Sequence, residues 1–451
     1  MKRVVTCLKN LILAPFCWWV RKKTGLSKTQ SRELSKCTIA LLYKFNGLHL
    51  KRSAKYLRLM LNQINWKEFN LTEDLFRQAL KDGSAPAGYT ELQGAWFTID
   101  SQVYNRSAPR VENTDTITYY GSGREPFLAL ANQQSRKVVM LPYFTCFTVF
   151  QPFLENGWEI VHYKVDRDLR MDCREVLALA EKHRPAIAVF MEYSGIDLNR
   201  RELDTIGVLK NSGCVTVVDR TQNIYSTVKS PEVDYYCGSL RKWFCIPDGG
   251  YLEKNSNLPL PPAPDAGVCN DVYATANSVK MFTAGIAREK NSASYMELSN
   301  FFYTLATSYI CGQPVRARNM SDYSRAVYMA ERSKDDDYIQ RRRENFRYIL
   351  EHIADCQSVQ PVCKDCDLFT AAPLYFHVYA KNRSGLTQYL KKRGIKTWIN
   401  WTKPNHLGVV DGQSDFIFNH ILSLCCDQRY TQEDMSLLCD AIKAYDEHET
   451  A

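Results

Sequence analysis

The sequence lacks an apolar run long enough to cross a bilayer. The apolar stretch at 11–20, LILAPFCWWV, has only ten residues and lies between Lys9 and the basic Arg21-Lys22-Lys23, whereas a spanning helix needs about 20 residues. No small-residue cleavage site follows this stretch, so we do not expect a signal peptide. The sixteen cysteines therefore indicate reduced thiols in the cytoplasm rather than a disulfide framework.

The sequence also lacks a pattern that predicts a metal site. Its one Cys-x-x-Cys pair, Cys363 and Cys366, has neither a second pair nor a histidine at ligand spacing. We expect a surface loop there and no bound metal. There is no internal repeat and no low-complexity tract. With 451 residues of ordinary globular composition, the chain is long enough for one two-lobed unit or for two to three domains.

Acidic residues are almost absent from the first 60 positions. This segment, the basic leader, holds fourteen Lys and Arg but only Glu33 as an acid, so it carries more than the whole net charge of +9. The remainder of the chain is mildly acidic. A basic leader on an acidic body is not typical of an enzyme that acts on nucleic acid, and we expect no nucleic-acid partner.

Part of the basic leader has the spacing of an amphipathic helix. Lys51, Lys55 and Arg58 recur at helical intervals and form one basic face. Such a helix usually has a solvated face and packs on the main body or on a partner subunit. The alternative is peripheral contact of residues 1–60 with an anionic membrane surface, with Trp18 and Trp19 at the level of the headgroups.

From Tyr119 onwards, apolar strands alternate with helical patterns. Regular alternation of this kind predicts an α/β fold with a largely parallel sheet covered on both faces. The ends of its strands then share one edge, because crossovers between parallel strands are right-handed. The predicted strands are 137–141, 186–191 and 214–219, and the predicted helices are 125–132, 147–156 and 200–211.

Helical and strand patterns return after an irregular, Pro-rich region, and they predict a smaller α+β lobe. We expect helices at 337–353, 385–393 and 431–444, with a strand at 374–379. The chain then divides into a largely helical N-terminal extension, a large domain and a small C-terminal domain, with boundaries at 1–115, 116–319 and 320–451.

The stretch from Cys214 to Leu252 contains the residues with the clearest chemical meaning. Val215 to Val218 predict a strand buried on both faces, so Asp219 lies where that strand emerges. Ligands of open α/β sheets bind at this edge. Lys242 follows 23 positions later, before the double glycine Gly249-Gly250. A carboxylate for a ring nitrogen and an amine for a carbonyl together suit pyridoxal phosphate (PLP).

These residues, with Gln222, Ser239 and the earlier Ser122-Gly123-Arg124, resemble the core of the fold-type I PLP enzymes. Among those enzymes, the DegT-type sugar aminotransferases are the most similar. The resemblance covers 119–252 and 320 to the end. It implies an aspartate-aminotransferase-like large domain with a mostly parallel seven-stranded sheet, a smaller α+β C-terminal domain, PLP as cofactor, and a homodimer.

The resemblance assigns the catalytic roles to Lys242 and Asp219. Lys242 would form a Schiff base with the cofactor, and burial near other positive charge would keep its amine neutral. Asp219 would hold the ring nitrogen protonated, which lets the ring withdraw electrons. Each has an ordinary alternative: Lys242 as a surface lysine in a basic turn, and Asp219 as a helix cap or a partner of Arg220.

The remaining assignments concern cofactor binding. Gln222 would hydrogen-bond the ring hydroxyl, or else it is a turn glutamine. Ser122, Gly123 and Arg124 would bind the phosphate at the start of a helix, where backbone N–H groups are unpaired, or else they form a plain turn. Ser239 would reach the same phosphate. An aromatic side chain that stacks on the ring in relatives aligns near Cys146.

The resemblance implies a cytoplasmic aminotransferase that acts on a keto sugar, with nucleotide-linked sugars as the expected class and an amino acid as donor. Two alternatives stay open. The same residues would serve another PLP reaction, such as a dehydratase or lyase. The chain could also be a non-catalytic scaffold of this fold, attached to a membrane surface through its basic leader.

Overall fold

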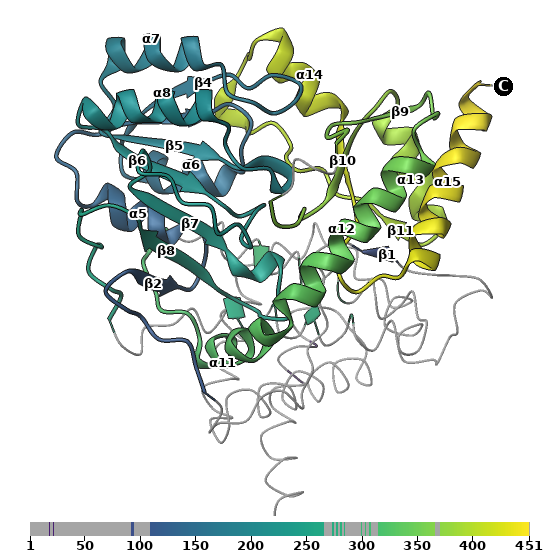
Figure 1. Cartoon of the computed structure of the whole chain (residues 1–451), viewed down its shortest axis with the longest axis horizontal. Coiled ribbons are helices and arrows are strands. Elements are labelled where there is room, and N and C mark those ends of the chain that lie inside the picture. The colour runs from purple at the N-terminus through teal and green to yellow at the C-terminus, as the bar shows by residue number, and fades with distance from the viewer. Residues whose placement is uncertain are drawn as a thin grey trace, which may run out of the picture.

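The computed structural model describes residues 109–265, 314–365 and 370–450, together with isolated positions before 109 and between 273 and 307 (Figure 1). Apart from Trp18 and Arg21, the basic leader lies outside the described residues, and so does Cys366. The predictions for the leader therefore stay predictions. The surface loop predicted at the Cys-x-x-Cys pair is wrong for Cys363, which is buried in the core of the second lobe.

A seven-stranded, mostly parallel sheet forms the first lobe. Only β8 runs antiparallel to both of its neighbours, β2 and β7. The α/β class and the mostly parallel seven-stranded sheet are thus confirmed. In spatial order the strands are β2 (Ile117–Tyr120), β8 (Gly250–Lys254), β7 (Tyr235–Ser239), β6 (Val215–Asp219), β5 (Ile187–Met191), β3 (Val138–Pro142) and β4 (Glu159–Tyr163).

Both faces of this sheet are buried, because each strand alternates apolar side chains between two helical layers. Val189 packs with α5 (Glu125–Ala131) and α6 (Phe147–Glu155), whereas its neighbour Phe190 packs with α7 (Cys173–His183) and α8 (Arg200–Asn211). Figure 1 shows α7 and α8 together on one side of the sheet. The sheet edge thus remains the part of the lobe open to a ligand.

The second lobe is a three-stranded antiparallel sheet packed against helices. Its strand order is β12 (Ile421–Leu424), β10 (Phe376–Ala380) and β9 (Val359–Pro361). This arrangement confirms the predicted smaller α+β lobe, although the boundaries between domains stay predictions. The helices are α12 (Asp335–His352), α13 (Arg383–Lys392), α14 (Gly412–His420) and α15 (Gln432–Thr450). Helix α11 (Asp322–Glu331) precedes them and packs against Tyr119 of β2 and Tyr251 of β8 in the first lobe.

A short parallel pair joins a segment early in the chain to the second lobe. Strand β1 (Leu92–Gln93) pairs with β11 (Ile395–Lys396), which directly follows α13. Within the described ranges, no helix is both long and apolar enough to cross a membrane. The same ranges contain no group of three or more His, Cys, Asp or Glu side chains placed to hold a metal ion.

Candidate active site

The strand register brings the separate sequence motifs to one edge of the first sheet. Asp219, the last residue of β6, pairs with Cys237 of β7. Two residues further along β7, Ser239 pairs with Gly250, and Gly250 also pairs with Tyr120 at the end of β2. Tyr120 and Gly250, which are 130 positions apart in the chain, therefore meet where the parallel strands end.

Two glycines allow the motifs to pack closely at this edge. A Cβ atom on Gly250 would lie 2.5 Å from the carbonyl carbon of Ser122, and one on Gly123 would lie 2.9 Å from the Cβ of Ser239. Real Cβ contacts are essentially never shorter than 3.0 Å. One corner therefore joins Gly250 to three of the four predicted phosphate-binding residues, Ser122, Gly123 and Ser239, and we call these four residues the glycine corner.

Asp219 is buried, with 4% of its surface exposed, and its Oδ1 accepts the Thr221 N–H at 2.7 Å. Its neighbour Arg220 turns away and forms an ion pair with Glu192 at 3.0 Å. The alternative prediction, an Asp219–Arg220 pair, is therefore wrong. Burial raises the pKa of Asp219, while the Thr221 hydrogen bonds and the positive charge of Lys242 oppose that rise.

Lys242 ends a 3₁₀ turn, η2 (Leu240–Lys242), that directly follows β7. Its Nζ lies 5.7 Å from the centre of the Trp401 ring, so the second lobe contributes to its surroundings. Burial lowers the pKa of Lys242; Cys146 and Asp219 counteract this effect, and Arg241 adds to it. A lowered pKa increases the fraction of neutral, nucleophilic amine.

Gln222 lies deep in the same region. Its Oε1 accepts the Ser194 N–H at 2.7 Å and faces Nε2 of His377 at 3.4 Å. Because its oxygen is engaged with the protein, only the NH₂ group of Gln222 is left to face a ligand. An amide that donates there suits an electron-rich oxygen on the ligand.

The glycine corner offers donors for an anion, but not all of the predicted ones. The Ser122 hydroxyl donates to Glu125 at 3.0 Å. The buried Arg124 guanidinium donates to Gln151 of α6. By contrast, the Ser239 hydroxyl and the Gly123 N–H have no hydrogen-bond partner within the described residues, so both can serve a phosphate group.

Three site residues were not predicted: His377, Trp401, and Cys146 as a neighbour of Lys242. A histidine inside the apolar strand Phe376–Ala380 is the one signal that could have identified His377.

Phe144 packs against Trp401 in the hydrophobic core, with ring centres 5.2 Å apart, and is almost fully buried. Cys146, two positions later, is the residue of that segment whose charge affects the pKa of Lys242.

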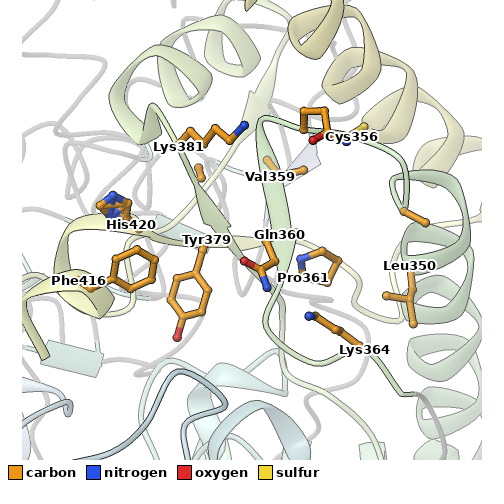
Figure 2. A pocket seen from close by; sticks show the side chains of 13 residues that line it. Leu350, Cys356, Val359, Gln360, Pro361, Lys364, Tyr379, Lys381, Phe416 and His420 are labelled. Atoms are coloured by element: carbon orange, nitrogen blue, oxygen red, sulfur yellow. The ribbon is translucent and has the colours of Figure 1, made fainter. Parts of the chain in front are cut away.

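A pocket of about 800 Å³ lies elsewhere, on the second lobe. Figure 2 shows the rings of Tyr379 and Phe416 and the side chains of Lys364 and Lys381 around it. None of its lining residues is a predicted site residue. It also lacks an acid, which the expected chemistry needs beside the amine, so the candidate active site is the sheet edge.

No protein-family model and no curated protein matches the chain, but solved structures do. The aminotransferase TlmJ from Streptoalloteichus hindustanus has 16% identity and a TM-score of 0.55, over 75% of this chain and 87% of TlmJ. DesI, solved in the presence of its TDP-sugar product, has 15% identity and a TM-score of 0.58, over 80% and 95%. Spr1654 from Streptococcus pneumoniae, in its PLP form, has 14% identity and a TM-score of 0.56, over 76% and 93%. The chain therefore has the aminotransferase fold that the resemblance implied.

Proposed function

We propose that the chain is a PLP-dependent aminotransferase that transfers an amino group from an amino acid to a keto sugar, with nucleotide-linked sugars as the expected acceptors. The observation that carries the proposal is the placement of Asp219 at the end of β6 and of Lys242 in the turn that follows the neighbouring strand β7. Their side chains act on each other electrostatically at one sheet edge, and Arg220, the cation next to Asp219, is occupied by Glu192.

The donors and acceptors of the site fit PLP. Lys242 supplies an amine for the aldehyde, Asp219 a carboxylate for the ring nitrogen, and Gln222 an amide NH₂ for the ring oxygen. At the glycine corner, we assign the phosphate to the Gly123 N–H and the Ser239 hydroxyl. Ser122 and Arg124 belong to the same loop and help through its backbone, since their side chains bind Glu125 and Gln151.

When bound, PLP supplies a carbonyl that joins to amines and a ring that withdraws electrons from the attached carbon. Asp219 keeps a proton on the ring nitrogen, because a buried carboxylate is stabilised by a positive charge beside it. With its amine free, Lys242 would be the group that accepts the proton from the substrate carbon and later donates it again. Burial lowers the pKa of Lys242, which increases the fraction of neutral amine able to accept that proton.

The identity of the acceptor is supported by the structural neighbours. DesI was solved with a TDP-sugar product, and it covers 80% of this chain. A keto sugar has the carbonyl group that an aminotransferase needs in its second half-reaction. We also propose that the protein forms a homodimer and is located in the cytoplasm.

Two half-reactions test the proposal separately. The PLP-loaded chain is mixed with single amino acids, and conversion of the cofactor to its amine form is followed by absorbance. A panel of keto sugars, free and nucleotide-linked, is then added, and the products are identified by mass spectrometry. An aminated sugar supports the proposal. Loss of water or a cleaved substrate would indicate a dehydratase or lyase, and no reaction with a colourless protein would indicate a scaffold.

A further inference from the structure

A chain of hydrogen bonds connects the second lobe to Gln222. His377 lies on β10 with 3% of its surface exposed. Its Nε2 is 3.4 Å from Oε1 of Gln222, and its Nδ1 is 2.9 Å from Oγ of Ser423 on β12. No residue in this chain of contacts reaches the surface, so its geometry is set by packing rather than by solvent.

The direction of each hydrogen bond follows from chemistry. The Ser194 backbone N–H can only donate, so the Gln222 atom 2.7 Å away must be the amide oxygen. His377 faces that same oxygen and must therefore carry its proton on Nε2. Nδ1 is then the acceptor, and the Ser423 hydroxyl donates to it. Gln222 consequently has only its NH₂ group available for a ligand.

The surroundings of His377 favour its neutral form. Burial and the positive charge of Lys242 lower the pKa of His377 to about 3. The ring of Tyr375 packs edge-on at 5.9 Å, and the described contacts include no carboxylate near the imidazole. The Nε2–H tautomer therefore persists across the neutral pH range.

We infer that His377 is a positioning residue, which from the second lobe holds the Gln222 amide so that its NH₂ donates to the ring oxygen of the cofactor. The inference rests on the proposed function. It makes the contact between the two lobes part of the cofactor site. It also predicts that Gln222 favours an anionic ring oxygen, since the amide can only donate there.

The test measures the pH at which the visible absorption band of the PLP-loaded protein converts between its protonated and deprotonated forms. It is made on the wild type and on variants. His377→Phe keeps the ring volume but removes the donor. An anionic oxygen that loses a donor becomes more basic, so we expect conversion to move upwards by about one pH unit. Gln222→Leu should cause a similar shift, and the double variant should shift no further than Gln222→Leu alone. His162→Phe, at a second poorly exposed histidine whose ring stacks on Tyr143, should leave the conversion unchanged.

A second measurement needs no variant in the site. Nitrogen NMR of histidine-labelled full-length chain, with His377 assigned by its loss in His377→Phe, should show the neutral Nε2–H tautomer from pH 8 to pH 5, with and without PLP. A protonated imidazole or the Nδ1–H tautomer in that range would overturn the inference. The inference would also be overturned if the visible band of His377→Phe converted at the same pH as that of the wild type. A wild type with no visible band at saturating PLP would instead refute the proposed function, and the inference with it.

Discussion

Gly250 packs against Ser122 so closely that a Cβ atom on Gly250 would lie 2.5 Å from the Ser122 carbonyl carbon. Gly250 begins β8, and its register places it between β2 and β7. The loop that carries Ser122 and Gly123 therefore reaches Ser239 only because this strand begins with a glycine. The double glycine is part of the site as well as of the fold.

Gly250→Ala should loosen the glycine corner. The added methyl group must push the Ser122 backbone away, which costs about 2 kcal/mol of stability, the range for overpacking. We expect weaker PLP binding and a lower melting temperature. The control is Gly412→Ala, because a Cβ atom at Gly412 meets nothing within 4 Å. Should Gly250→Ala bind PLP as tightly as Gly412→Ala does, the phosphate is not held at this corner.

Asp219→Asn should slow the first half-reaction by about 100-fold, the usual scale for one preorganised electrostatic contact. The asparagine oxygen can still accept the Thr221 N–H, so the fold should persist. What is lost is the negative charge that keeps the ring nitrogen protonated. Single-turnover absorbance with an amino acid donor measures the rate. A rate within threefold of the wild type would remove Asp219 from the catalytic residues.

Glu125 should make the stability of the chain depend on pH. Burial raises its pKa to about 7 from 4.5, and its hydrogen-bond donors are the backbone N–H groups of Gly121 and Arg318 and the Ser122 hydroxyl. Because the folded pKa is raised, the stabilisation is fully present below about 4.5 and is lost as the pH rises through about 7. Burial also raises the pKa of Glu192, whereas it lowers the pKa values of His162 and His377.

Comparison with Glu125→Gln isolates this one group. Glutamine stays neutral at every pH. The free energy of unfolding of Glu125→Gln, relative to that of the wild type, should therefore increase by about 2 kcal/mol between pH 5.5 and pH 8. Urea unfolding at both pH values measures the difference. Equal effects of the substitution at both pH values would show that the carboxyl group is ionised throughout and that its burial is offset by other charges.

Strands buried on both faces could be predicted from sequence because their residues are continuously apolar. Predicted strands 186–191 and 214–219 correspond to β5 and β6 within one residue. Strand β4, EIVHY, was not predicted: it lies at the edge of the sheet, and Glu159 and His162 interrupt its apolar pattern. Helix α14 was missed as well, since its sequence GQSDFIFNH has little amphipathic character.

Within the site, the order of motifs predicted the meeting of Asp219, Ser239 and Gly250, because the ends of parallel strands share one edge. His377 could not be placed in this way. It is 155 positions after Gln222 and reaches it only through the packing of the second lobe. The Arg124 side chain was expected at the phosphate, but it lies buried against Gln151, where a cation finds an oxygen acceptor between two helices.

The central claim is that Lys242 is the amine that joins PLP, and a second buried lysine among the described residues is a rival. Lys280 is also buried, and burial together with Arg241, Lys396 and Arg429 holds its pKa well below the ordinary value. A neutral amine at that position would also attack an aldehyde. Absorbance alone would not distinguish the two lysines.

Borohydride reduction of the PLP-loaded wild type, followed by peptide mass spectrometry, identifies the modified lysine directly. We expect the pyridoxyl group on the peptide that contains Lys242. We also expect the visible band to be lost in Lys242→Ala and retained in Lys280→Ala. A pyridoxyl group on Lys280, or an unmodified Lys242 in a protein that has bound PLP, would contradict the account.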